Sequence, residues 1–222
     1  MAQGRRRMLS LKQFKNERSA NNKGFTLIEI AVVLVIIGLI IGAAVKGKDL
    51  IQSGKQKKFY TNSLKAWELV VVSYYDRTGF ALGDGTVNGG SAGVTDGRFD
   101  NVRGSAFTNI DARLKAVGLT VPTSNTANSG QFSFKGQYSG TQTITLNLWY
   151  LRSNTDARNN NAFYLQNVPT DLAIALDTMV DGQANSSSGT FRQYPDNTSA
   201  TGAWPDASVT TVVNAQYILD VP

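Results

Sequence analysis

The sequence KGFTLIEIAVVLVIIGLIIGAAV, at residues 23–45, decides the fold of the N-terminal part of the chain. The 21 residues from Phe25 to Val45 contain one charged side chain, that of Glu29. At a rise of about 1.5 Å per residue, a helix of this length is about 31 Å long, which matches the hydrocarbon core of a bilayer. The stretch therefore predicts a membrane-spanning helix with a carboxylate near its start.

Positive charge is concentrated in front of this stretch. Residues 1–24 contain seven basic residues and one acidic residue, whereas the rest of the chain holds 15 of each sign. The net charge of +6 therefore belongs to the leader, which argues against nucleic-acid binding by the remainder. A dense basic leader should stay in the cytoplasm, so the C-terminal part should cross the membrane. The lysines from Lys46 to Lys65 are expected to form a solvated or headgroup-facing collar.

The chain contains no cysteine and no histidine. Disulfides and thiolate chemistry are excluded, and the commonest general base and transition-metal ligand are missing. Acidic residues are scattered, and no nucleophile motif or phosphate-loop spacing is present. We therefore expect no enzymatic activity, no catalytic residue, no metal and no cofactor.

The order of the leader and the apolar run differs from that of an ordinary secretory signal. Small polar residues and Gly24 come before the apolar run, and no small-residue cleavage site follows it closely. Cleavage is therefore expected at Gly24, which would keep the helix in the mature protein and free the α-amino group of Phe25. Glu29 then has two interpretations. It either snorkels to the headgroups, or its carboxylate neutralises the Phe25 amine of a neighbouring subunit among parallel helices.

Residues 23–38 resemble the N-terminus of type IV prepilins and of the pseudopilins of type II secretion. A glycine, an aromatic residue, a threonine and a glutamate coincide there with an uninterrupted apolar run. The resemblance implies cleavage between Gly24 and Phe25 by a prepilin peptidase, and N-methylation of Phe25. It also implies that Glu29 is the assembly carboxylate and that Thr26 belongs to the assembly site.

The resemblance covers about residues 20–50, with one departure. Many members of the family have a proline where this chain has Lys46. Gly38, Gly42 and Gly47 either loosen the helix in this region or allow close packing between helices, because each glycine weakens a helix by about 1 kcal/mol.

The helical pattern continues beyond the apolar run. An apolar stripe at spacings of three and four predicts that the helix extends from Phe25 to about Asp76 and packs against a head. The residues of this stripe are Tyr60, Leu64, Trp67, Val71 and Tyr74 or Tyr75. Gly79 is expected to end the helix. Residues 79–104 are rich in Gly, Asp, Ser and Asn and predict a long loop. Asp84, Asp96 and Asp100 fit turns better than a calcium loop, because their spacing matches no EF-hand.

The rest of the chain predicts a mainly antiparallel sheet with short helices. A helix is expected at about residues 109–117 and another after Pro169, ending at Gly182. Alternating patterns predict a hairpin of residues 131–138 and 141–152 around Gly140. Further strands are expected at residues 162–168, 209–213 and 216–221, with a polar loop at residues 183–208.

Residues 176–192 resemble a C-terminal element common in long prepilin-like proteins. There, aspartates precede a glycine-rich turn and a strand. Val180 occupies a position that is frequently acidic in that element, so we do not expect a metal. Asp177 and Asp181 are expected to be solvated or to cap local backbone groups.

Together these observations predict an α+β, pilin-like chain. Residues 1–24 are expected to form a removable leader, and residues 25–78 the pilin helix. Within this helix, residues 25–45 are the transmembrane and filament-core part. Residues 79–222 are expected to form the head. The resemblance implies a structural subunit of a type IV pilus-like filament; the alternatives are a type II secretion pseudopilin or a membrane-tethered binding module.

The expected partners follow from the same resemblance. They are identical or related pilin subunits in a helical filament, the prepilin peptidase and methyltransferase, the inner-membrane assembly machinery and, before assembly, membrane lipid. No nucleic acid is expected. The precursor would lie in the inner membrane as a single-pass protein with its head outside the cytoplasm, and the mature protein in a surface pilus or a periplasmic pseudopilus.

Overall fold

The computed structural model describes residues 24–91, 93–152, 159–195 and 202–221. The predicted leader, apart from Gly24, lies outside the described residues. The chain divides into two compact units, the first ending at Gly47 and the second, called the head unit below, beginning at Lys48. Each unit is described by itself. The architecture is α+β, as predicted, with an N-terminal helix and a five-stranded antiparallel sheet.

The N-terminal helix has three parts. Helix α1 (Leu27–Phe59) leads into one π-helical turn, η1 (Tyr60–Leu64), and then into α2 (Lys65–Thr78). Helix α1 continues through Gly38, Gly42 and Gly47 without a break. Gly79 ends α2 in the left-handed conformation, with φ of 72°, and its N–H donates to the Tyr75 carbonyl at 2.7 Å. Both ends of the helix therefore lie within two residues of the predicted limits.

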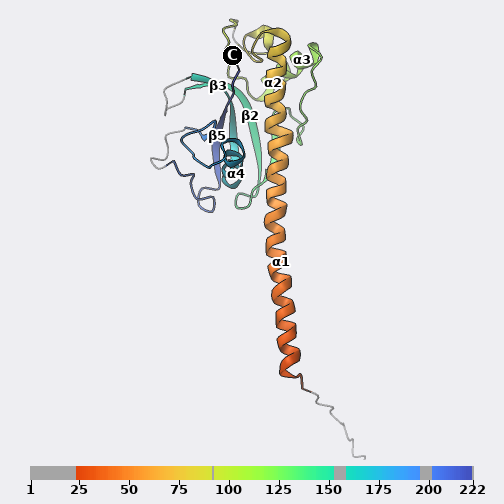
Figure 1. Cartoon of the computed structure of the whole chain (residues 1–222). Coiled ribbons are helices and arrows are strands. Elements are labelled where there is room, and N and C mark those ends of the chain that lie inside the picture. Colours follow the sequence, from red (N-terminus) through yellow and green to blue (C-terminus); the bar gives the residue numbers. More distant parts are fainter. Residues whose placement is uncertain (1–23, 92, 153–158, 196–201, 222) are drawn as a thin grey trace, which may run out of the picture. The chain divides into compact units, whose positions relative to one another are not determined.

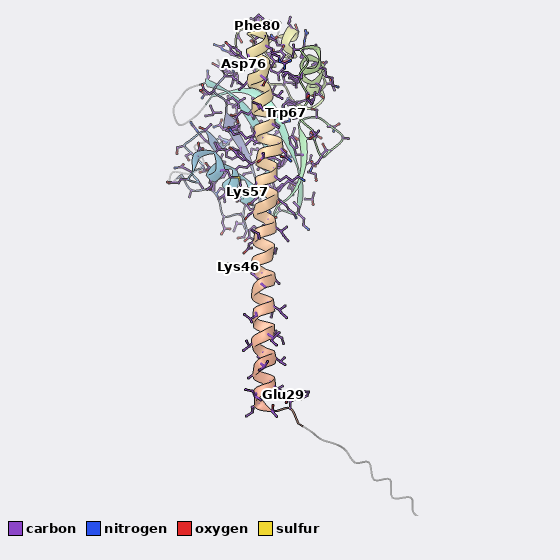
Figure 2. The ribbon with its side chains drawn as sticks, turned by 45° about the vertical axis from the view of Figure 1, so that its right-hand side comes forward. Glu29, Lys46, Lys57, Trp67, Asp76 and Phe80 are labelled. Atoms are coloured by element: carbon purple, nitrogen blue, oxygen red, sulfur yellow. The ribbon has the colours of Figure 1, made fainter. Side chains whose placement is uncertain are left out.

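The π-helical turn was not predicted, and it keeps the apolar residues of the helix on one face. Phe59 and Trp67 are eight residues apart, which in a regular α-helix would place them about 80° apart around the axis. A π-helical turn absorbs one extra residue, so the two side chains come within about 20° of each other. Both are buried, with Leu64, Val71 and Tyr74. Figure 2 marks Lys57 and Trp67 along the helix; Lys57 is exposed, as the sequence predicted.

The sheet is built from long, neighbouring antiparallel strands, and β2, β3 and β5 are labelled in Figure 1. The strand order is β1-β2-β3-β5-β4. Its members are β1 (Gln131–Lys135), β2 (Thr141–Arg152), β3 (Asn159–Pro169), β4 (Phe191–Gln193) and β5 (Val212–Ile218). The predicted hairpin of β1 and β2 is confirmed.

Two strand predictions were wrong at the C-terminus. The structure has one strand, β5, where two were predicted at residues 209–213 and 216–221. Asp206 begins a turn instead, because its backbone carbonyl accepts the N–H groups of Val209 and Thr210. The predicted strand at residues 209–213 therefore begins in a turn, where the Val209 side chain is exposed.

Alternating side chains on β3 pack on the two faces of the sheet. Phe163 and Leu165 belong to the main core, which also contains the buried side chains of η1 and α2. Ala162 and Tyr164 point to the opposite face, where Tyr164 stacks on Trp149 with the ring centres 4.5 Å apart. The sheet is therefore apolar on both faces along β3, as expected for a central strand.

Two short helices complete the main core. Helix α3 (Phe107–Ala116) follows a 3₁₀ turn, η3 (Gly104–Ala106), and buries Phe107, Ile110 and Leu114. Helix α4 (Thr170–Asp181) buries Leu172, Ala173 and Leu176 and ends at Gly182, as predicted.

The helix and the sheet are joined by polar contacts as well as by apolar packing. The Tyr217 hydroxyl on β5 donates to Glu68 on α2 at 2.6 Å, and the Lys65 ammonium lies 2.7 Å from the same carboxylate oxygen. Burial and the hydrogen bond to Glu68 raise the pKa of Tyr217, so the phenol stays protonated. These contacts connect β5 to α2, two elements that lie about 150 residues apart in the sequence.

The free edge of β1 is covered by a side chain. The Asn125 amide accepts from the Ser133 N–H and donates to the Ser133 carbonyl, both at 2.7 Å. This pair of bonds imitates a neighbouring strand at Ser133, the middle residue of β1.

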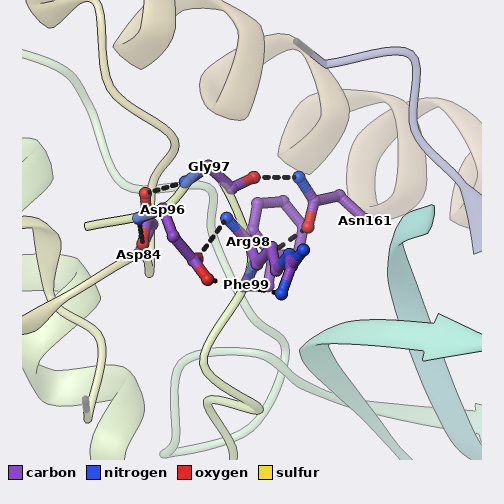
Figure 3. A network of polar contacts seen from close by, with 6 residues as sticks. All are labelled: Asp84, Asp96, Gly97, Arg98, Phe99 and Asn161. Atoms are coloured by element: carbon purple, nitrogen blue, oxygen red, sulfur yellow. Dashed lines mark hydrogen bonds and ion pairs between the residues drawn. The ribbon is translucent and has the colours of Figure 1, made fainter. Parts of the chain in front are cut away.

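The loop of residues 79–104 is anchored in the head unit rather than lying freely over it. Asp84 is buried, and its carboxylate accepts the backbone N–H groups of Asp96 and Gly97 at 3.0 and 2.7 Å. Asn161 of β3 accepts from the Phe99 N–H and donates to the Gly97 carbonyl (Figure 3). A short 3₁₀ turn, η2 (Thr86–Asn88), lies within the loop. The acidic side chain of Asp84 therefore serves turn formation, as the sequence predicted.

Candidate functional site

The start of α1 is closed by a capping box. The Glu29 carboxylate oxygen Oε2 accepts from the Thr26 N–H at 2.7 Å and from the Thr26 hydroxyl at 2.8 Å. The Glu29 N–H in turn donates to the Thr26 hydroxyl oxygen at 3.2 Å. Such a reciprocal pair satisfies backbone N–H groups that the first turn of a helix leaves without partners. Thr26 and Glu29 are thereby fixed together at the beginning of the helix; Figure 2 marks Glu29 there.

This local role of Glu29 was not predicted from the sequence. The two predicted roles were contact with headgroups and contact with a neighbouring subunit. The spacing of Thr26 and Glu29, with two residues between them ahead of an apolar run, is the capping-box signature and is visible in the sequence. The structure thus adds a third role: Glu29 is a helix-capping residue within its own chain.

Gly24 and Phe25 lie exposed just before the capping box. A Cβ atom added at Gly24 would meet no atom within 4 Å, and its backbone does not need the left-handed conformation that favours glycine. The side chain of Phe25 is 82% exposed. The fold of the described chain therefore gives no structural reason for a glycine at position 24.

The first unit has apolar side chains around the whole helix. Each large apolar side chain from Phe25 to Val45 exposes between 45% and 93% of its surface. The helix is long and apolar enough to cross a membrane, with a mean hydropathy of 2.9 over 18 residues. A soluble monomer rarely exposes such a continuous apolar surface, so this surface suits contact with lipid or with other protein chains.

The two aspartates of the C-terminal element both hold backbone groups. Asp181 accepts the N–H groups of Thr190 and Phe191, at 3.0 and 2.8 Å. Asp177 is fully buried and accepts the Asn185 N–H at 2.7 Å, so of the two expected roles, solvation and capping of local backbone groups, it has the second. Among the described residues, no group of three or more His, Cys, Asp or Glu side chains is placed to hold a metal ion.

Comparison with known proteins locates one family feature in the chain. Residues 19–45 match the family model of the prokaryotic N-terminal methylation motif. No curated protein and no solved structure matches the chain. The match begins five residues before Gly24, covers the capping box and ends with the apolar run. The chain thus carries the N-terminal methylation motif that is characteristic of type IV prepilins and pseudopilins.

Proposed function

We propose that this chain is a structural subunit of a type IV pilus-like filament. In this proposal a prepilin peptidase removes residues 1–24 by cutting between Gly24 and Phe25, and Phe25 is then N-methylated. Residues 25–78 form the assembly helix, of which residues 25–45 become the filament core, and residues 79–222 form the head. The methylation motif at residues 19–45 supports processing of this kind and assembly into filaments.

The observation that carries the proposal is the exposed apolar helix of the first unit, which no other described part of that unit covers. Before assembly, lipid can cover this surface. In a filament, helices of identical or related subunits can cover it, and exchanging lipid contacts for helix contacts costs little because both are apolar. The same surface then serves as membrane anchor and as assembly surface.

The geometry of Glu29 supports a role in setting the register between subunits. The capping box uses Oε2 for both of its bonds, and Oε1 accepts no hydrogen bond from any described residue. Cleavage would create an ammonium group on Phe25. The Oε1 atom of one subunit can pair with that ammonium of its neighbour, and such a pair in a low dielectric fixes the axial position of two helices. Thr26 contributes by holding the carboxylate in place.

The proposed partners and location follow from this mechanism. The precursor is anchored in the inner membrane and meets the prepilin peptidase, the methyltransferase and the assembly machinery there. The head lies outside the cytoplasm, and the mature subunit is found in a pilus at the cell surface. The role is structural, without catalysis or a cofactor, and nucleic acid is not among the partners.

Substitutions of Glu29 test the proposal. Glu29→Gln keeps an acceptor for the capping box but removes the charge, whereas Glu29→Ala removes both. We expect both variants to be cleaved normally and to be lost from sheared filaments by at least about tenfold, because both lack the charge that pairs with Phe25. Thr26→Ala is the matched control, since it breaks the capping box but leaves the charge, and it should be incorporated better than either. Wild-type incorporation of Glu29→Gln would contradict the register mechanism.

Electron microscopy of the surface fraction separates the proposal from its alternatives. A long surface filament containing this chain supports the pilus. A pseudopilin, which would use the same N-terminal chemistry, would remain in a short periplasmic assembly. A processed chain that stays monomeric in lipid would instead indicate a tethered binding module.

A further inference from the structure

The C-terminal part of the head unit contains a buried carboxyl group that the proposed filament mechanism does not use. Asp177, on the last turn but one of α4, exposes none of its surface. Its Oδ2 atom accepts from the Trp204 indole N–H at 2.6 Å and from the Asn185 N–H at 2.7 Å. Its Oδ1 atom is also buried and accepts no hydrogen bond from the described residues.

A second carboxyl group lies one helical turn from the first. Asp181 follows Asp177 by four residues on the same side of α4, and its carboxyl group is among the causes that raise the pKa of Asp177. Both Asp181 oxygens accept N–H groups where the chain enters β4, from Thr190 and from Phe191. The space around Asp181 is tight, because a Cβ atom on Gly189 would come within 2.5 Å of its Oδ2 atom. The pair therefore connects α4 to the loop of residues 182–190 and to the edge strand β4.

Two neighbouring carboxyl groups on one side of a helix repel each other when both are ionised, and a wholly buried carboxylate is costly by itself. A protonated carboxyl group is a hydrogen-bond donor. A proton on Asp177 Oδ1 would provide that buried atom with a partner, the Asp181 carboxylate, and would leave Oδ2 to accept its two bonds. A calcium ion would need about six to eight oxygen ligands. Among the described residues, no group of three or more His, Cys, Asp or Glu side chains forms here, which favours a proton over a cation.

We propose that Asp177 and Asp181 share one proton in the folded head, and that loss of this proton releases the loop of residues 182–190 and strand β4 from α4. The pair is thus a pH-sensitive latch at one edge of the sheet, opposite to the edge that Asn125 covers. It acts independently of cleavage and of Glu29.

Two further charged side chains of the C-terminal part have hydrogen-bond partners other than the pair. Arg192, on β4, donates through Nε to the Gly189 carbonyl, and Asp206 accepts from the Ser208 N–H and hydroxyl. Burial is the main cause that raises the pKa of Asp177 to about 6; the bonds from Trp204 and Asn185 oppose this shift, and the Asp181 carboxyl adds to it.

The sign of the pH dependence follows from that shift. When the latch is open and solvated, the pKa of Asp177 is near its usual 3.8. The closed state binds its proton more tightly, so closure is favoured at low pH. Between about pH 4 and about pH 6, each rise of one pH unit lowers the equilibrium constant for closing the latch by up to about tenfold. Above about pH 6 this equilibrium constant no longer changes with pH.

Hydrogen exchange of the full chain in detergent micelles, with EDTA present, tests the latch. Protection factors for amides of residues 182–191, corrected for intrinsic exchange rates, should fall by at least about tenfold between about pH 4.5 and about pH 7. In Asp177→Asn, a neutral isostere of the protonated acid, they should stay level. The matched control, Asp206→Asn, removes a carboxylate after Trp204 that is not part of the pair, and it should keep the wild-type profile.

Two further measurements keep the test decisive if Asp177→Asn does not fold. Asp181→Asn removes the neighbouring charge, so it should move the midpoint of the profile to lower pH. Calcium added at about pH 8 should not restore protection. A level wild-type profile, an unchanged midpoint in Asp181→Asn, or recovery with calcium would each overturn the shared proton.

Discussion

At the scale of single residues, the N-terminal site consists of a few residues around the peptide bond between Gly24 and Phe25. The Thr26 and Glu29 side chains close the first turn of α1, and Gly24 and Phe25 remain exposed in front of it. From the sequence, Gly24 and Phe25 are expected to form the cleavage site, and Glu29 is expected to act in assembly because it is the one charge in the apolar run; these roles stay predictions. The sequence did not predict which oxygen of Glu29 is already used, since that depends on the conformation of the capping box.

Gly24 provides a prediction at this scale. Gly24→Leu should leave the fold of the head and the helix unchanged, because a side chain at position 24 meets open space. It should block cleavage, because a bulky residue at the scissile bond cannot enter a peptidase site made for glycine; Gly24→Ala should retain partial cleavage. Gel electrophoresis measures the outcome as loss of the shift of about 2–3 kDa that accompanies removal of the leader. Normal cleavage of Gly24→Leu would contradict the assigned cut site.

At the scale of elements, the sequence predicted most helices and strands correctly and missed features that depend on tertiary packing. The stripe through Leu64, Trp67 and Val71 was visible because its spacing is regular. The π-helical turn was not visible in the sequence. It corrects the angle around the helix axis between Phe59 and this stripe, and the correction is needed only because both segments pack on the same core. β4 is three residues long and is held by Asp181 and β5, so its pattern alone is too short to identify.

A deletion tests the role of the π-helical turn. Thr61 is exposed, and its hydroxyl bonds only to the Lys57 carbonyl of the previous turn among the described residues. Deleting it should convert η1 to regular α-helix while Phe59 and Trp67 stay on one face. We expect the unfolding free energy to change by about 1 kcal/mol or less.

Deletion of Leu69 is the matched control. Leu69 is also exposed, but it lies in the regular helix α2, so removing it rotates the flanking segments by about 100° and turns buried side chains away from the core. The cost should be about 3 kcal/mol or more. Urea unfolding followed by tryptophan fluorescence measures the stability of both deletion variants. Equal losses in the free energy of unfolding would show that the π-helical turn holds no removable residue.

At the scale of the whole molecule, the two units bury their apolar residues in different ways. The head unit has its own core, and its polar contacts, such as that of Tyr217 with Glu68, close within it. In the described part of the first unit, residues 24–47, the large apolar side chains are exposed and belong to no core. This difference between the two units was predictable from composition, because the long apolar run of residues 25–45 cannot be well hydrated. The choice between a pilus and a pseudopilus depends on surfaces of assembled subunits, which composition does not determine.

The central claim is that the chain is cut before the apolar helix and enters a filament with that helix intact. Mass spectrometry of the N-terminal peptide of the chain recovered from sheared surface filaments tests it most directly. We expect this peptide to begin at Phe25 and to carry one N-methyl group. A filament-associated chain that retains the leader, or one that begins after Val45 and has lost the apolar helix, would contradict it.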